Sequence, residues 1–293
     1  MKNGECRILT DETVRAWLPR RPIDGHKGTF GHLLSVCGSR GMAGAACFAA
    51  EAAYRCGTGL VTAAMPEGIY PLLTTQVPEA VCTLLPEDVG GGVDAAATAL
   101  LLPRLSKANA VLCGCGWGTG DGALAVLRFL LKETTCPLVV DADGLNLLAA
   151  HIDTVETDAP LCLTPHPAEA ARLLKTTVAA VEADRAHAAE MLAKRYGATV
   201  VLKGHETLIA SPQKPTLKNQ TGNDGLAKGG SGDVLAGMIA GLAAQGMPLY
   251  EAAACGVYLH GLAGERAASR LSRHGVLARD VIAELSHLFS DYE

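Results

Sequence analysis

A cluster of glycines and a single carboxylate mark residues 223–237, which read NDGLAKGGSGDVLAG. Three glycines fall within residues 229–232, and Asp233 follows them directly. The apolar residues after Asp233 recur at the spacing of one helical face, so a helix is predicted to begin between Ser231 and Asp233. The sequence therefore places a lone acid in the first turn of a helix, immediately after a flexible turn.

This junction has the composition of an anion-binding site. A helix N-terminus offers unpaired N–H groups and the positive end of the helix dipole. Glycine lets a bulky anion approach the backbone without interference from a Cβ atom. We therefore expect a phosphate to be held by Gly229, Gly230, Ser231 and Gly232. The segment is not a Walker A loop, because it lacks the pattern G-x-x-x-x-G-K-[ST].

Two interpretations of Asp233 are compatible with these residues alone. An acid at the start of a helix is favoured by the helix dipole, whatever its further role. A carboxylate beside a phosphate site is otherwise unfavourable, because it repels the anion. It becomes useful if it accepts a proton from a hydroxyl that attacks phosphorus, as a general base does in phosphoryl transfer.

Along the chain, apolar runs of strand length alternate with helical stretches. Such alternation indicates βαβ crossovers and a mainly parallel sheet covered by helices on both faces. No repeat or break in composition divides residues 1–293, so we expect one α/β domain. The predicted strands are 32–38, 59–65, 109–114, 136–143, 160–166 and 198–204, with 206–211 as a hairpin partner. The main predicted helices are 44–57, 122–133, 144–151, 167–175, 231–245, 248–269 and 278–290.

Polar and glycine residues follow the predicted strands at one kind of place. Gly38, Gly114, Asp141, Thr164 and Lys203 each lie at the carboxyl end of a predicted strand. In open α/β sheets, ligands bind in the crevice at that edge. These residues are therefore predicted to line one cleft.

The overall composition narrows the class of protein. The 293 residues carry a formal net charge of −5 and no basic block, which argues against a nucleic-acid or anionic-membrane partner. The sequence shows neither an N-terminal apolar signal region nor an apolar run of membrane-spanning length. The ten cysteines are scattered through apolar segments, and the close pair Cys113 and Cys115 lacks metal-ligand spacing. We expect a reduced, cytoplasmic protein that does not enter the membrane.

Six segments resemble, in collinear order, the ADP/ATP-dependent NAD(P)H-hydrate dehydratase family of the ribokinase-like superfamily. The resemblance implies a three-layer α/β/α sandwich with a mainly parallel central sheet. It further implies nucleotide-dependent removal of water from the S epimer of hydrated NADH or NADPH (NADHX or NADPHX), with ADP converted to AMP and phosphate. The family also suggests a homotetramer, and we expect the epimerase that serves this reaction to be a separate protein. The segments are 26–66, 113–118 (CGCGWG), 139–149 (VVDADGLNLLA), 163–174 (LTPHPAEAARLL), 200–210 (VVLKGHETLIA) and 223–242 (NDGLAKGGSGDVLAGMIAGL).

The same resemblance implies roles for individual residues. Asp233 matches the family's general base, and it is expected to contact the hydrate substrate together with Ala45, Gly116 and His166. The nucleotide is expected to contact Lys203, Gly204, His205, Glu206, Thr207 and Gly232. A Mg²⁺ ion is expected because phosphoryl transfer usually requires one to neutralise charge.

Several of these assignments have a structural alternative. The HPAE segment that begins at His166 also reads as a helix start, with Pro at the first helical position and Glu at the third. Residues 203–207 also read as a hairpin turn with a solvated lysine. Asp141 and Glu169 are candidates for water-mediated Mg²⁺ contacts, and salt bridges or helix caps explain both acids equally well. Asp224 is expected to face solvent, because a second acid that pointed inward would oppose anion binding.

Two other functions are compatible with the sequence. A vitamin-precursor kinase of the same superfamily, of the hydroxymethylpyrimidine or hydroxyethylthiazole type, shares the Gly-Gly-x-Gly-Asp junction. The TPHPAE segment and the MAGA segment at residues 42–45 favour the dehydratase. A non-catalytic nucleotide-binding protein is disfavoured because Asp233 and the complete anion site are present.

The adenine pocket treats ADP and ATP alike, and we expect ADP to be the donor.

Overall fold

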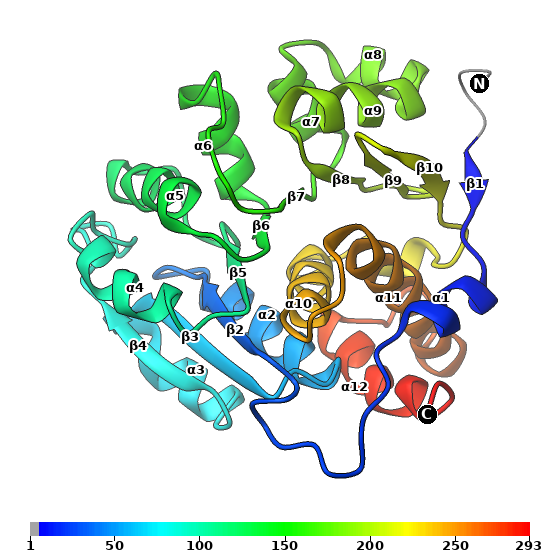
Figure 1. Ribbon diagram of the computed structural model, residues 1–293, viewed down its shortest axis with the longest axis horizontal. Helices are drawn as coiled ribbons and strands as arrows, with labels where there is room; N and C mark the ends of the chain where they lie inside the picture. The colour runs from blue at the N-terminus through cyan, green and yellow to red at the C-terminus, as the bar shows by residue number, and fades with distance from the viewer. Residues whose placement is uncertain (1–5) are drawn as a thin grey trace.

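The structure, a computed structural model, describes residues 6–293, and its strands form one sheet (Figure 1). The strand order is β1-β10-β9-β8-β7-β6-β5-β2-β3-β4. Neighbouring strands from β8 to β4 are parallel, whereas β9 is antiparallel to both β8 and β10. The strands are β1 (Arg7–Ile8), β2 (His32–Val36), β3 (Leu60–Pro66), β4 (Val81–Leu85), β5 (Ala110–Cys113), β6 (Leu138–Val140), β7 (Leu161–Leu163), β8 (Thr199–Leu202), β9 (Leu208–Ser211) and β10 (Lys214–Lys218).

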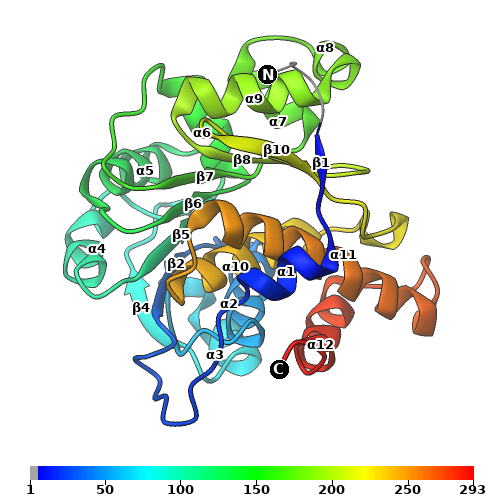
Figure 2. The same ribbon diagram turned by 45° about the vertical axis from the view of Figure 1, so that its right-hand side comes forward.

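Helices cover both faces of this sheet, which gives three layers (Figures 1 and 2). Helices α1–α3 and α10–α12 pack on one face, and α4–α9 pack on the other. They are α1 (Asp11–Trp17), α2 (Ala43–Arg55), α3 (Tyr70–Gln76), α4 (Ala97–Leu105), α5 (Asp121–Glu133), α6 (Asp143–His151), α7 (Pro167–Leu174), α8 (Val178–Ala183), α9 (Arg185–Tyr196), α10 (Ser231–Ala244), α11 (Leu249–Leu271) and α12 (Ala278–Phe289). Two short 3-10 segments span Glu67–Ile69 and Asp224–Leu226.

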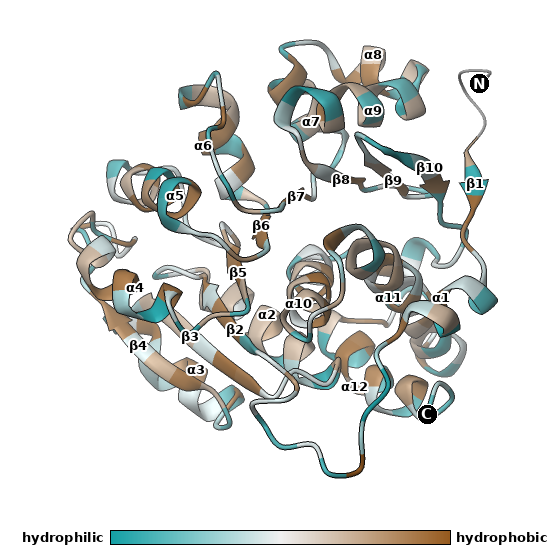
Figure 3. Ribbon diagram, in the orientation of Figure 1, coloured by the Kyte–Doolittle hydropathy of each residue, from teal (hydrophilic) through white to brown (hydrophobic). Residues whose placement is uncertain are grey.

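The sheet separates two hydrophobic cores. Successive side chains of a strand point to opposite faces, so Leu112 of β5 joins the core under α10 while Val111 and Cys113 join the other. In β8, Val201 and its neighbour Val200 divide in the same way. Strands buried on both faces are expected to be continuously apolar, and Figure 3 shows the central strands mostly in the apolar colour.

Helix α10 lies against α2 at glycine positions that leave no room for a side chain. A Cβ atom at Gly237 would lie 2.3 Å from the carbonyl oxygen of Ala49. A Cβ atom at Gly241 would lie 2.7 Å from Oγ1 of Thr58, whose hydroxyl donates to the carbonyl of Gly241. This close approach fixes α10 on the sheet, and it thereby fixes the first turn of α10 at the carboxyl edge of the strands.

Most of the predicted architecture is confirmed. The three layers, the mainly parallel sheet, the hairpin after residue 204 and a helix that begins at Ser231 are all observed. The sequence does not predict β1, β4 or β10, which lie toward the two ends of the sheet. Strand β4 alternates between buried and exposed residues, and β1 has only two residues, so neither shows the continuous apolar pattern of the central strands. Within residues 6–293, no helix has the length and apolar character needed to cross a membrane.

Candidate active site

Three of the predicted strand-end residues meet at one carboxylate. Asp141 follows β6, Thr164 follows β7 and Lys203 follows β8. Lys203 Nζ donates to Asp141 Oδ1 at 2.8 Å, and Thr164 Oγ1 donates to the same oxygen at 2.7 Å. The Asp141 residue is 1% exposed, so these two donors compensate a charge that has been removed from water. The carboxyl edge of the sheet therefore carries a buried, oriented ion pair.

Asp233 faces this ion pair from the first turn of α10. Single ligand atoms of Asp233, Asp141 and Cys115 all lie within 4.8 Å of one another. Burial and the charge of Asp141 raise the pKa of Asp233 to about 6, although Lys203 and the Cys115 thiol act in the opposite direction. At neutral pH the side chain is therefore mostly a carboxylate whose proton affinity is higher than usual. That is the state a general base requires.

The glycines before Asp233 serve different purposes. Gly230 has φ +90, and a Cβ atom there would lie 2.6 Å from the ring of Phe48. A Cβ atom at Gly232 would lie 3.5 Å from Lys203 Nζ, and one at Gly229 would meet nothing within 4 Å. Gly230 therefore forms the turn into α10, whereas Gly232 and Gly229 leave space beside the ion pair and in front of the helix terminus.

The predicted nucleotide-binding residues line one cavity of about 970 Å³, which is large enough for a nucleotide. They are Lys203, Gly204, His205, Glu206, Thr207 and Gly232. Other lining residues escape sequence reasoning because they lie on the turn-rich approach to α10 or on one face of a buried helix. Among them are Asn219, Thr221, Leu226, Val257 and His260.

His166 and Glu169 form a helix cap at the rim of this cavity. The backbone N–H groups of Ala168 and Glu169 donate to His166 Nδ1, and the His166 N–H donates to Glu169 Oε2 at 2.8 Å. The structural alternative noted for this segment is thus observed. The ring still lines the cavity, and its Nε2 lies 3.3 Å from Glu169 Oε1. Burial raises the pKa of Glu169 to about 7, and burial together with Lys203 lowers the pKa of His166.

Ala45 and Gly116 lie against each other. A Cβ atom at Gly116, whose φ is +65, would lie 2.8 Å from the Cβ of Ala45. Neither residue lines the 970 Å³ cavity. Gly116 directly follows Cys115, which faces Asp233, whereas Gly232 on the cavity side directly precedes Asp233. Asp233 is therefore linked to the cavity through its chain neighbour Gly232, and to the small-residue pair through Cys115.

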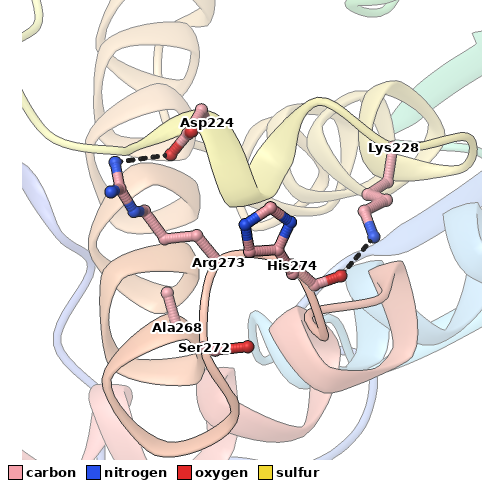
Figure 4. Close-up of a pocket in the computed structure, with 6 residues that line it drawn as sticks. All are labelled: Asp224, Lys228, Ala268, Ser272, Arg273 and His274. Carbon is pink, nitrogen blue, oxygen red and sulfur yellow. Dashed lines mark hydrogen bonds and ion pairs between the residues drawn. The ribbon is translucent and has the colours of Figure 1, made fainter.

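The Asp224 side chain faces solvent, as expected, although the residue also lines the 970 Å³ cavity. Its side chain is 70% exposed and pairs with Arg273 at 3.0 Å (Figure 4). Lys228 Nζ donates to the carbonyl oxygen of His274 at 2.7 Å in the same view. These two contacts join the segment before α10 to the loop between α11 and α12 around a second cavity of about 510 Å³.

Comparison with known proteins identifies the family. A family model described as NAD(P)H-hydrate dehydratase matches residues 33–287. The ADP-dependent (S)-NAD(P)H-hydrate dehydratase of Neisseria meningitidis is 47% identical over 249 residues, which cover 84% of this chain and 80% of that protein. The chain belongs to the NAD(P)H-hydrate dehydratase family.

Other members of the NAD(P)H-hydrate dehydratase family agree in sequence and in fold. The bifunctional NAD(P)H-hydrate repair enzyme of Moorella thermoacetica is 42% identical over 98% of this chain, and the chain spans 54% of that enzyme's length. The crystal structure of the ADP/ATP-dependent NAD(P)H-hydrate dehydratase from Bacillus subtilis, co-crystallized with ATP/Mg²⁺, has a TM-score of 0.85 at 32% identity. It covers 98% of this chain and 99% of its own. A hydroxyethylthiazole kinase from Pyrococcus horikoshii, at 14% identity and a TM-score of 0.58, shares the fold alone.

Proposed function

We propose that this chain dehydrates the S epimer of NADHX or NADPHX and uses ADP as the phosphoryl donor. The position of Asp233 carries the proposal. It directly follows Gly232, which lines the cavity together with Lys203, and it faces Cys115, which directly precedes Gly116. A base beside a nucleotide cavity can accept the proton of a hydroxyl that attacks the donor's terminal phosphorus.

The proposed chemistry replaces a poor leaving group by a good one. Asp233 accepts the proton of the ring hydroxyl while the hydroxyl oxygen bonds to the terminal phosphorus of ADP, and AMP leaves. The lone pair of the ring nitrogen then expels phosphate. The neighbouring ring carbon loses a proton as the double bond re-forms. The products are the dihydronicotinamide, AMP, phosphate and a proton.

The residues around Asp233 stabilise the charge that develops in this transfer. The N–H groups of Gly229, Gly230 and Gly232 before and at the start of α10 would face the transferring phosphoryl group, whereas the Ser231 N–H donates to the carbonyl oxygen of Lys228. Lys203 supplies a positive charge that is already oriented by Asp141. Bound Mg²⁺ would neutralise phosphate charge. Of the two candidate acids, Asp141 fits a water-mediated contact with this ion better than Glu169 does. Asp141 Oδ2 meets no N–H or O–H donor among residues 6–293, whereas the Glu169 oxygens contact the His166 N–H and ring.

The wider context of the enzyme is also proposed. The named Neisseria relative supports ADP as donor, and the Bacillus relative crystallized with ATP/Mg²⁺ supports ATP as a second one. The bifunctional relatives support functional pairing with an NAD(P)H-hydrate epimerase. We also infer one domain over residues 1–293 and a homotetramer, and light scattering on the purified protein tests the latter.

The deciding experiment incubates the protein with hydrated NADH, Mg²⁺ and either ADP or ATP, and follows the return of dihydronicotinamide absorbance. With ADP we expect one AMP and one free phosphate for each NADH formed. Asp233→Asn should abolish most of this turnover while the protein still binds nucleotide. A stable phosphate ester on a hydroxymethylpyrimidine or hydroxyethylthiazole, with no NADH formed, would instead establish the kinase alternative.

A further inference from the structure

The thiol of Cys115 lies within the charged centre of the site. Its Sγ atom is 3.8 Å from Asp141 Oδ2, and the side chain is fully buried. The sequence predicts no role for this cysteine, because the pair Cys113 and Cys115 lacks metal-ligand spacing. In the fold, Cys113 points to the opposite core. Cys115 follows β5, Asp141 follows β6 and Asp233 lies in the first turn of α10, so three separate segments bring one sulfur and two carboxylates together.

The two oxygens of Asp141 have different surroundings. Oδ1 accepts from Lys203 and Thr164, whereas among residues 6–293 no N–H or O–H donor reaches Oδ2. The contact of Oδ2 with the Cys115 thiol is a weak one, because S–H is a poor donor. A buried carboxylate oxygen without a strong donor is unfavourable. This oxygen is therefore aimed, with free lone pairs, into the same small space as the sulfur and the second carboxylate.

A mixed set of one sulfur and two oxygens suits a borderline-soft cation. Zn²⁺ takes thiolate at about 2.3 Å and carboxylate oxygen at about 2.0–2.2 Å in tetrahedral sites. Mg²⁺ prefers oxygen and octahedral geometry, so the sulfur discriminates against it. The charges of the proposed ligands and of a divalent cation also balance. Asp141 and Asp233 outnumber Lys203 by one negative charge, and a dication that replaces the thiol proton brings the group to neutrality.

We propose that Cys115, Asp141 and Asp233 form an inhibitory site for a thiophilic divalent cation, with Zn²⁺ as the physiological candidate. The Cys115 thiol releases its proton to solvent, a metal–sulfur bond forms, and no electron transfer occurs. Asp141 Oδ2 and Asp233 supply the other protein ligands, and a water molecule takes the fourth position. Lys203 and Thr164 keep Asp141 oriented through its other oxygen. The bound cation holds Asp233 and removes the general base, an inhibitory effect that rests on the proposed function.

Binding of Cd²⁺ to the nucleotide-free protein tests the site without any assay of catalysis. We expect one equivalent of Cd²⁺ to bind and to produce an ultraviolet thiolate-to-metal charge-transfer band. Cys115→Ala should lose the band and weaken binding by more than about 100-fold, the upper end of what loss of an outer-shell partner costs. Cys56→Ala is the matched control, because it removes another buried thiol from the end of α2, far from Asp141, and should keep both band and affinity.

Two further measurements keep the proposal testable if Cys115→Ala folds poorly. Asp233→Asn should retain the band but bind Cd²⁺ more weakly, since one oxygen ligand is replaced by an amide. Zn²⁺ should inhibit dehydration by the wild-type protein, excess Mg²⁺ should not relieve the inhibition, and a chelator should. If the charge-transfer band of bound Cd²⁺ is absent in the wild-type protein, or unchanged in Cys115→Ala, the proposed metal site is wrong. A normal band in a protein that forms no NADH overturns the proposed function instead and leaves the site standing.

Discussion

The carboxylate of Asp233 is held in surroundings that disfavour its charge, and this sets an expectation for pH dependence. Its pKa of about 6 means that the basic form is lost as pH falls through that value. We expect kcat/KM to decline below about pH 6, since kcat/KM reports the free enzyme's essential base. Asp141 raises the pKa of Asp233 and Lys203 lowers it. Asp141→Asn should therefore move the decline in kcat/KM to lower pH, and Lys203→Met should move it to higher pH. If the pH at which kcat/KM declines changes in neither variant, the decline belongs to a group other than Asp233.

The same residue should oppose stability and favour activity. A folded-state pKa raised from 3.8 to about 6 means that the folded state binds this proton more tightly than the unfolded chain does. Stability therefore falls as pH rises from about 4 to about 6, and it stays lower above that range. Asp233→Asn removes this cost of up to about 3 kcal/mol, and a general base typically contributes about 10²–10⁴-fold in rate.

Denaturant unfolding of Asp233→Asn and of wild type, near pH 8 and near pH 4.5, measures how much the charged Asp233 carboxylate lowers the free energy of unfolding. We expect the variant to be inactive and clearly more stable at the higher pH, with a smaller advantage at the lower one. Equal stability at both pH values would contradict the burial of a charged Asp233.

At the scale of elements, the Gly-rich entry to α10 separates folding from ligand binding. Gly230→Ala meets the Phe48 ring at 2.6 Å and a φ of +90, so we expect a loss of about 1–3 kcal/mol in stability. Gly232→Ala lies within the helix, where alanine is favoured, but its methyl group would stand 3.5 Å from Lys203 Nζ. We expect this variant to keep its stability and to bind ADP more weakly.

Thermal unfolding and calorimetric ADP titration of the two variants provide the comparison, with Gly246→Ala as a control at another positive-φ glycine with open space around it. The control should resemble Gly230→Ala in direction but leave ADP affinity unchanged. If Gly232→Ala binds ADP as wild type does, the space beside Lys203 is not where the nucleotide phosphate lies.

Local pattern reveals some of these elements and hides others. The start of α10 at Ser231 is visible because glycines, one acid and a helical apolar face follow one another within a few residues. The convergence of Asp141, Thr164 and Lys203 follows from parallel strands that end at one edge. The partnership of Cys115 with two carboxylates is not readable, because the three residues come from segments far apart in sequence. The role of His166 is not readable from sequence either, since the same HPAE pattern caps α7 and lines the cavity.

At the scale of the whole molecule, the site has one direction of approach, and this should make the reaction stereospecific. Asp233 and Gly229–Gly232 define a line from base through hydroxyl to phosphorus, and small misplacements from such a line are costly. Hydration creates a stereocentre, and the other epimer carries its hydroxyl on the opposite ring face. We therefore expect only the S epimer to react directly.

An epimer mixture should then show a fast phase equal to the reactive fraction. The slow phase should follow spontaneous epimerisation, should not respond to more enzyme, and should vanish when an epimerase is added. Comparable rates for both purified epimers, measured before they interconvert, would show that the geometry around Asp233 accepts either face.

Helix α10 is packed so closely that it should not move when ligands bind. Every residue from Val234 to Ala244 is buried, and Gly237 and Gly241 touch α2 without space for even a methyl group. A helix seated in this way can neither slide nor rotate, so its backbone amides should be among the slowest in the chain to exchange with deuterium. Nucleotide should slow exchange in the cavity-lining segments 204–207 and 219–228 while leaving α10 unchanged. The catalytic base then belongs to the rigid part of the molecule, and the ligand-responsive part is the cavity wall formed by residues 204–207 and 219–228.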